Sequence, residues 1–251
     1  MSESDPVTRP EVDGGQVQPS EAVLAPRNRI VGWATDLGTP TTLVLLRHGE
    51  TQGSVGKLFS GRGGHDHELT ELGRHQALLA AEAVRVRGGV EAVISSPLRR
   101  CRETAAYAAQ ALGLEVAVDD DLAEAAFGDW DGLTYEQVEQ RWPEELGDWL
   151  GRTSVAPPGG ESIEAVEARV LRARDRIVAS HQGVVVLVVA HVNPIKCLVR
   201  VALDAPPAAI YRMAMSPASA SEIDYYPDGT SVLRTFGVAA HLAGAASILG
   251  G

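Results

Sequence analysis

The chain has 251 residues, which is long enough for one well-buried α/β domain with a tail and too short for two large domains. Hydrophobic residues make up 45% of the sequence and charged residues 22%, proportions that exclude a fibrous or wholly disordered chain. The formal net charge of -11 argues against a surface built to bind nucleic acid, because such surfaces need clustered, uncompensated Lys and Arg.

The cysteines and the N-terminus bear on the cellular compartment. Cys101 and Cys197 lie in apolar helical patterns without paired spacing, so we expect buried, reduced thiols. The N-terminus lacks the basic and then apolar pattern of a signal peptide, and no apolar run is long enough to span a bilayer. We therefore expect a cytoplasmic enzyme without a membrane partner.

Changes in composition divide the chain into segments. Residues 1–40 are rich in Ser, Pro, Gly, Glu and Asp and show no periodicity, which predicts a disordered tail or linker. The folded domain is expected over 41–240, followed by a flexible C-terminal tail at 241–251. Within the domain, residues 119–160 break the regular pattern, and an insertion this long is often a lid.

Short apolar strands alternate with amphipathic helices through most of the domain. Strands are expected at 42–46, 90–94, 114–118 and 184–189. Helices are expected after caps at Thr70, Ser96 and Asn193 and over 162–180, and an Asp228-Gly229 turn joins two antiparallel strands. This pattern predicts a three-layer α/β/α fold with a mostly parallel central sheet.

The insertion carries two further features. Thr134 with Gln137 predicts a capping box at the start of a short helix. Three tryptophans could wall a substrate pocket, although packing in the core is the commoner use of such residues. They are Trp130, Trp142 and Trp149.

Two of the predicted strands end in a histidine. His48 follows the first strand and His191 follows the strand at 184–189, and the carboxyl edge of an open α/β sheet is where ligands bind. A single histidine at a strand end is more often structural. Here Arg47 precedes the first histidine and the segment Ser-Ser-Pro-Leu-Arg-Arg ends a third strand, so the joint pattern favours a functional site over two incidental histidines.

These residues belong to a longer series of motifs, and with them the sequence resembles the histidine phosphatase superfamily, which includes phosphoglycerate mutases and acid phosphatases. The resemblance covers residues 41–236. Its motifs are "LLRHGET" at 45–51, "FSGR" at 59–62, "LTELG" at 69–73, "SSPLRRCRETA" at 95–105, "LAEAAFGDWDGLTYEQV" at 122–138, "PPGGES" at 157–162 and "VVAHVNPIK" at 188–196.

The resemblance implies a role for individual residues. His48 corresponds to the histidine that carries the phosphoryl group, and Glu124 to the proton donor. Arg47 and Arg100 correspond to the two arginines that hold the phosphate and His191 to the second histidine of the phosphate pocket, whereas Arg99 is expected to face solvent. The residues implied to contact the substrate are Gly49, Ser54, Ser60, Gly61 and Val192.

The chemistry suits these residue types. Arginine stays protonated and donates paired hydrogen bonds to phosphate oxygens. An imidazole attacks only through an unprotonated nitrogen, so its other nitrogen must hold the proton in a fixed hydrogen bond, for example to a backbone carbonyl. A carboxyl group can protonate the leaving oxygen and then, once ionised, activate water.

No metal ion or cofactor is expected. His65 and His67 have a spacing that suits a metal, but no third ligand pattern accompanies them, and zinc sites need three or four ligands. Asn193 begins a helix directly after the second histidine, so backbone N–H groups there could point at the phosphate or simply cap the helix.

The expected function is hydrolysis of a small phosphorylated metabolite by an acid phosphatase or an α-ribazole phosphatase-like enzyme. The sequence is similar to the phosphatase domain of actinobacterial proteins that also carry a ribonuclease H domain, but residues 1–40 leave no room for the nuclease, so ribonuclease activity is not expected. Phosphoglycerate mutase activity and a non-catalytic phosphate-binding module stay as alternatives. The oligomeric state is open, with a homodimer as one option.

Overall fold

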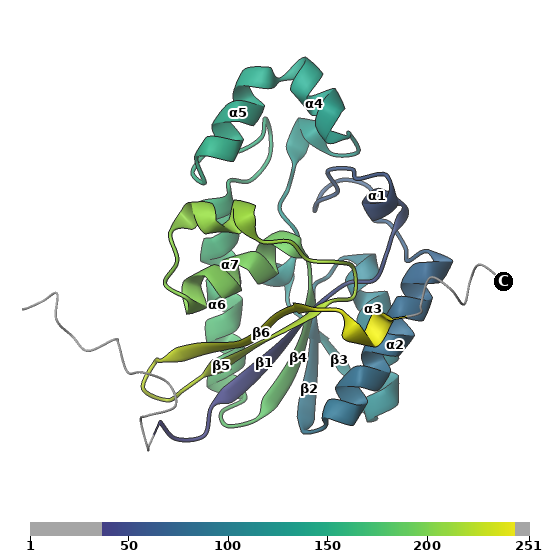
Figure 1. The fold of residues 1–251 in the computed structure, drawn as a ribbon, viewed down its shortest axis with the longest axis vertical. Helices are drawn as coiled ribbons and strands as arrows, with labels where there is room; N and C mark the ends of the chain where they lie inside the picture. The colour runs from purple at the N-terminus through teal and green to yellow at the C-terminus, as the bar shows by residue number, and fades with distance from the viewer. Residues whose placement is uncertain (1–36, 244–251) are drawn as a thin grey trace, which may run out of the picture. The chain divides into compact units, whose positions relative to one another are not determined.

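The computed structural model describes residues 37–243. The chain divides into two units, Met1–Thr35 and Asp36–Gly251, and every described residue belongs to the second. Within this unit a six-stranded sheet has the strand order β3-β2-β4-β1-β5-β6 (Figure 1). The strands are β1 (Thr41–Arg47), β2 (Val90–Ser95), β3 (Val116–Val118), β4 (Val185–Ala190), β5 (Ala220–Tyr225) and β6 (Ser231–Val238).

The sheet is mostly parallel, as expected. β4 lies between β2 and β1 and is parallel to both, which fits its run of β-branched residues. β5 is antiparallel to β1 and to β6, and the turn with Asp228 and Gly229 joins the last two strands. The mixed sheet therefore has a parallel core and an antiparallel edge.

Helices cover both faces of the sheet and give the three layers (Figure 1). Alternate residues of β1 point to opposite faces. Val44 and Leu46 pack with α2 and α3, whereas Leu43 and Leu45 pack with α6 and α7. The helices are α1 (Gln52–Val55), α2 (Glu71–Arg87), α3 (Arg99–Leu112), α4 (Tyr135–Arg141), α5 (Pro143–Gly151), α6 (Ile163–Ser180) and α7 (Val192–Ala202).

The insertion packs onto the domain as part of its core. Its 3-10 turns η2 (Asp120–Leu122) and η3 (Gly128–Trp130) lead into α4 and α5, which lie at the top of the ribbon (Figure 1). The side chain of Trp130 is fully buried, and Trp142 and Trp149 pack against the same cluster. Packing is thus the role of the three tryptophans. The capping box of Thr134 and Gln137 is confirmed.

Two predicted helix starts are wrong. α3 begins at Arg99 after Leu98, not after a Ser96 cap, because the Ser96 hydroxyl bonds His191 instead. α7 begins at Val192, so Asn193 and Pro194 lie within its first turn, where proline costs no hydrogen bond because the N–H groups there lack helical partners. β3 also begins two residues later than predicted.

The predicted tails fall mostly outside the described residues. Residues 37–40 have no regular secondary structure, and 1–36 lie outside the described part. At the other end Ala240–Leu242 form the 3-10 turn η5, and 244–251 lie outside. Among residues 37–243, no helix combines the length and the hydropathy that crossing a lipid bilayer requires.

Candidate active site

The ends of β1 and β4 bring the two histidines together. Arg47 is opposite Ala190 in the parallel register, and the next residue of each strand is a histidine. The N–H of His48 donates to the Ala190 carbonyl at 3.1 Å. The two imidazole centroids lie 5.2 Å apart at an interplanar angle of 61°. The sheet edge predicted from sequence is therefore one compact site.

His48 has the hydrogen bond that a nucleophilic imidazole needs. Its Nδ1 lies 2.7 Å from the Gly49 carbonyl, which can only accept, so Nδ1 carries the proton and Nε2 holds the free lone pair. Burial lowers the pKa of His48 well below its ordinary value of 6.5, and the cationic Arg100 and Arg47 lower it further. The imidazole is thus neutral, in the tautomer that leaves Nε2 unprotonated, as a nucleophilic histidine requires.

Two buried guanidinium groups flank the histidine. Arg100 is 2% exposed and donates from Nη2 to the Ser60 carbonyl at 3.0 Å, while Arg47 donates from Nη1 to the Met215 carbonyl. Neither arginine has an ion pair within residues 37–243. Arg47 Nε, Arg100 Nη1 and the Ser60 hydroxyl are buried and lack any hydrogen-bond partner.

His191 is held in one tautomer by its neighbours. Arg100 Nε donates to its Nδ1 at 3.3 Å, so the ring proton is on Nε2 and points to the Ser96 hydroxyl at 2.7 Å. Burial lowers the pKa of His191 well below its ordinary value, with Arg100 beside it. Both ring nitrogens are thus engaged within the protein, and donation to phosphate would need one of them to be released.

Glu124 enters the site from the loop that follows η2. Its side chain is 6% exposed. Its Oε1 accepts the Ala125 N–H at 2.8 Å, and its Oε2 lies 3.4 Å from the Asn193 N–H at the start of α7. The carboxyl group therefore faces the same cleft as the histidine and the arginines.

A cleft of about 200 Å³ joins these groups. Seven of the ten residues expected in the site line it, namely Arg47, His48, Ser54, Ser60, Arg100, Glu124 and Val192. Ser54 lines it with a hydroxyl that already bonds the backbone of Thr51 in the α1 capping box. The remaining three, Gly49, Gly61 and His191, lie outside the lining.

The two glycines have a packing reason to be glycine. A Cβ on Gly49 would lie 2.4 Å from the Gly73 carbonyl, and one on Gly61 would lie 1.9 Å from the Ala125 carbonyl. Backbone segments therefore meet at both positions. The substrate contacts expected of these glycines stay a prediction.

Sequence reasoning missed part of the cleft wall. Leu58, Phe59 and Phe127 give it an apolar side, with the two phenyl rings 5.1 Å apart in edge contact. Phe59 and Phe127 fall inside the "FSGR" and "FGDWDG" motifs, which was the available signal. Asn193 also lines the cleft, one residue after Val192.

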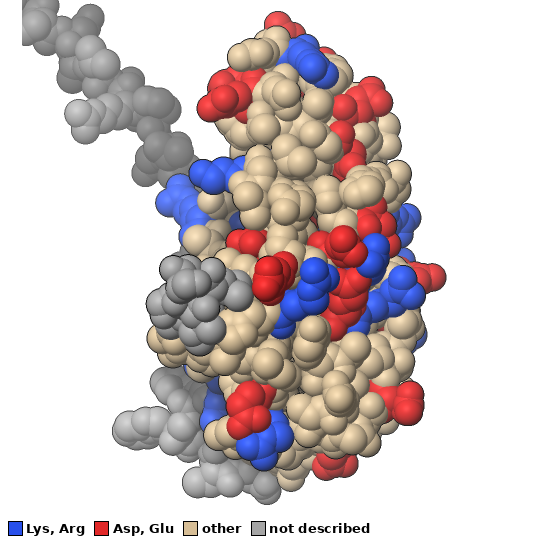
Figure 2. All heavy atoms as spheres, turned by 90° about the vertical axis from the view of Figure 1, so that its right-hand side faces the viewer, with Lys and Arg blue, Asp and Glu red and all other residues tan. Residues whose placement is uncertain are grey.

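Arg99 lies on the surface, as expected. It pairs with Glu68 and Glu103, and about half of its side chain is exposed. Figure 2 shows the face formed by α2 and α3, where acidic and basic side chains are intermixed. The next residue of α3, Arg100, is buried and lines the cleft, so two adjacent residues of one helix place one arginine at the surface and the other inside.

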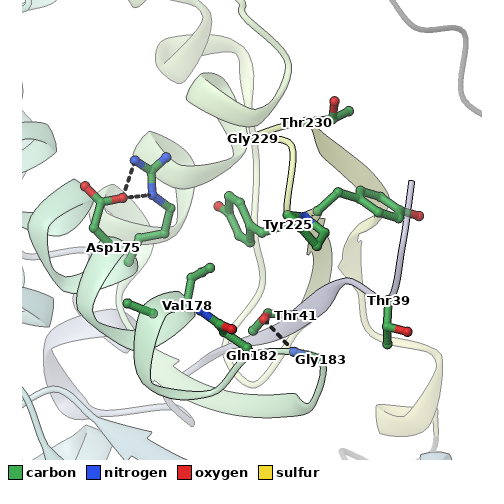
Figure 3. Close-up of a pocket in the computed structure, with 13 residues that line it drawn as sticks. Thr39, Thr41, Asp175, Val178, Gln182, Gly183, Tyr225, Gly229 and Thr230 are labelled. Atoms are coloured by element: carbon green, nitrogen blue, oxygen red, sulfur yellow. Dashed lines mark hydrogen bonds and ion pairs between the residues drawn. The ribbon is translucent and has the colours of Figure 1, made fainter. Parts of the chain in front are cut away.

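A larger hollow of about 440 Å³ lies at the other end of β1, near Thr39 and Thr41 (Figure 3). The cation of its lining, Arg174, is paired with Asp175. No histidine lines it. The histidine, the two arginines and the glutamate predicted from the sequence therefore line the smaller cleft and not this hollow.

The described residues contain no group of three or more His, Cys, Asp or Glu arranged to hold a metal ion. His65 and His67 lie with ring centroids 4.4 Å apart. The cysteines Cys101 and Cys197 are both free and buried, which confirms the expected reduced thiols.

Comparison with known proteins places this sequence among histidine phosphatases. The family "Histidine phosphatase superfamily (branch 1)" matches residues 43–236. The chain is 46% identical over 224 residues to Bifunctional protein Rv2228c of Mycobacterium tuberculosis, covering 89% of this chain and 60% of that protein. It is 43% identical over 127 residues to glucosyl-3-phosphoglycerate phosphatase of the same species, covering 51% of this chain and 56% of that protein.

Solved structures give the same result. A mycobacterial glucosyl-3-phosphoglycerate phosphatase superposes with a TM-score of 0.72 at 34% identity, over 79% of this chain and all of that one. A putative α-ribazole-5'-P phosphatase of Escherichia coli superposes with a TM-score of 0.70 at 28% identity, over 79% and 96% of the two chains. The chain therefore belongs to the histidine phosphatase superfamily, through a domain that carries its two strand-end histidines.

Proposed function

We propose that this chain hydrolyses phosphate monoesters through a phosphohistidine intermediate on His48, without a metal ion. The observation that carries the proposal is a set of buried polar atoms without partners, Arg47 Nε, Arg100 Nη1 and Ser60 Oγ, in the lining of the cleft that also holds the nucleophile. Buried donors without acceptors are costly. A phosphate group supplies the acceptors, and the two guanidinium groups balance its charge.

In the first step the Nε2 lone pair of His48 attacks phosphorus while the bond from phosphorus to the ester oxygen breaks. The carboxyl proton of Glu124 moves to that oxygen, and the alcohol leaves. Arg47 and Arg100 stabilise the charge that spreads over the phosphoryl oxygens in the transition state.

In the second step water attacks the phosphohistidine. The Glu124 carboxylate, which has given up its proton, takes one from the water, and the new oxygen-phosphorus bond replaces the nitrogen-phosphorus bond. Inorganic phosphate leaves, and His48 returns to its neutral form with the proton still on Nδ1. The low pKa of the buried imidazole favours this return.

The substrate is a small phosphorylated metabolite. Leu58, Phe59 and Phe127 form the apolar side of the cleft, where the alcohol half would lie. Similarity to phosphatases named for glucosyl-3-phosphoglycerate and α-ribazole-5'-phosphate supports hydrolysis. A mutase is the second candidate, because the chain is 36% identical over 166 residues to a 2,3-bisphosphoglycerate-dependent phosphoglycerate mutase of Methylorubrum populi.

The test is hydrolysis of phenyl phosphate with a chelator present. The proposal predicts release of phosphate that a chelator leaves unchanged and that His48→Ala abolishes. Activity lost with the chelator would contradict the metal-free mechanism. Conversion of 3-phosphoglycerate that depends on a bisphosphate, without net phosphate release, would favour the mutase.

A further inference from the structure

The motif "PPGGES" has no role in the chemistry above, and its glutamate lies beside a buried arginine of α6. Arg169 is 4% exposed. Its Nε and Nη2 donate to the two carboxylate oxygens of Glu161, each at 3.0 Å. This is a two-point ion pair with little solvent around it, although Glu161 is itself partly exposed.

The rest of the arginine holds the loop that carries the proton donor. Nη1 donates to the carbonyls of Asp121 and Ala123, at 2.8 and 2.6 Å, and Nη2 also donates to the carbonyl of Glu124 at 3.0 Å. Arginine has five N–H donors. All five N–H groups of Arg169 are therefore used, three on backbone carbonyls of the Glu124 loop and two on the Glu161 carboxylate.

Glu161 holds the same loop on its other side. Its Oε2 accepts the Ala126 N–H at 3.0 Å, and its own N–H donates to the Ala126 carbonyl at 2.8 Å. The preceding glycine is required for this approach, because a Cβ on Gly160 would lie 2.5 Å from the same carbonyl. The two glycines of "PPGGES" thus include one that lets the motif reach the loop.

Charge holds the pair together. Burial raises the pKa of the Glu161 carboxyl, but hydrogen bonds from Arg169 and from the Ala126 N–H outweigh it, so the pKa lies below its ordinary value of 4.5. The glutamate is ionised near neutral pH, and arginine stays protonated throughout.

We propose that the Arg169–Glu161 pair is a positioning device for catalysis, which fixes the backbone on both sides of Glu124 so that its carboxyl group delivers a proton to the leaving oxygen. This rests on the proposed function of Glu124 as proton donor. Within residues 37–243 the carbonyls of Ala123 and Glu124 have no other hydrogen bond. Without the pair these two carbonyls lose their hydrogen bonds, and the backbone from which the Glu124 side chain extends is held less firmly.

The readout is the dependence of the rate on the leaving group. A nitrophenolate leaves without help, whereas phenol, with a pKa of about 10, needs the proton during bond cleavage. A misplaced proton donor therefore slows hydrolysis of phenyl phosphate far more than hydrolysis of 4-nitrophenyl phosphate. A general loss of structure slows both reactions by the same factor.

The experiment compares kcat/KM for these two substrates in Arg169→Lys, Glu161→Gln and Glu124→Gln. We expect kcat/KM of each variant to fall about 100-fold for phenyl phosphate and less than about tenfold for 4-nitrophenyl phosphate. The reason is that a proton donor raises the rate by about 10²- to 10⁴-fold, and a small displacement of the donor removes much of this factor. Circular dichroism checks the fold, and Glu161→Gln serves if the lysine variant does not fold.

The control is Arg200→Lys, which changes a comparable two-point ion pair between α7 and α6. Arg200 pairs with Glu167 of α6 through Nε and Nη2 and donates to the Ala205 carbonyl, away from the Glu124 loop. Arg200→Lys should leave the ratio of kcat/KM for phenyl phosphate to kcat/KM for 4-nitrophenyl phosphate unchanged. Equal losses on both substrates in Arg169→Lys and Glu161→Gln, with selective loss in Glu124→Gln, would overturn the inference and leave the proposed function standing. Equal losses in Glu124→Gln would remove Glu124 as donor, and the inference with it.

Discussion

Arg100→Lys tests whether the guanidinium fork, and not merely a positive charge, is needed at this place in α3. Arg100 donates from Nε to His191 and from Nη2 to the Ser60 carbonyl, and its buried Nη1 has no partner among the described residues. A lysine ammonium has its three donors on one nitrogen at the end of a flexible chain. It cannot reach both protein acceptors and a phosphate oxygen together.

The size of the effect follows from these contacts. Two acceptors, the buried His191 Nδ1 and the partly buried Ser60 carbonyl, lose their partner, and each unpaired buried group costs about 1–3 kcal/mol. The free energy of unfolding should therefore fall by about 2–6 kcal/mol. In catalysis, one transition-state donor is lost, and such a loss lowers kcat by about 10²- to 10³-fold.

The assay is kcat/KM for phenyl phosphate per folded molecule, with unfolding followed in urea. Arg99→Lys is the matched control, because Arg99 lies one residue earlier on the exposed side of the same helix with surface ion pairs. It should leave both the rate and the stability close to those of the native protein. Equal losses in the two variants would refute the assignment of Arg100 to the phosphate site.

Two further predictions concern stability. His48 and His191 have pKa values held below 6.5, so their contribution is complete above pH 6.5 and is lost as the pH falls, because the unfolded chain takes up protons that the folded one does not. Urea unfolding should show that the free energy of unfolding falls below pH 6.5, by at most about 1.4 kcal/mol per pH unit for each histidine. His48→Gln should make this fall less steep. The same slope in His48→Gln as in the native protein would contradict the inference that burial lowers the pKa of His48. Gly61→Ala should lower the free energy of unfolding by about 1–3 kcal/mol, because the added Cβ overpacks against Ala125. The control is Gly147→Ala in α5, where a Cβ has open space, and it should be neutral or stabilising by about 0.5–1 kcal/mol. Equal changes in the free energy of unfolding would contradict the steric explanation.

The sequence predicted that the two histidines would lie together, because strand ends are local features. A buried apolar run fixes where β1 and β4 lie in the sheet, and parallel neighbours end at the same edge, so His48 and His191 had to meet. The choice of Arg100 over Arg99 also follows from the family pattern. The structure adds the partners of His48 Nδ1 and of both His191 ring nitrogens.

What could not be predicted depends on contacts between distant segments. The Ser96 hydroxyl was a good helix cap by its local sequence, but His191, 95 residues later, takes it. The Met215 carbonyl on Arg47 and the Arg169–Glu161 pair likewise join segments whose meeting no periodicity shows. Local preference was overridden wherever a buried polar group needed a partner.

The central claim is that His48 carries the phosphoryl group, and trapping that species tests it most directly. The protein is mixed with phenyl phosphate, quenched within milliseconds in alkaline denaturant to preserve phosphohistidine, digested and analysed by mass spectrometry. The account predicts one added phosphoryl group on the peptide that contains His48, present within the first turnover and absent in His48→Gln. A phosphoryl group on another residue, or one that persists in His48→Gln, would contradict it.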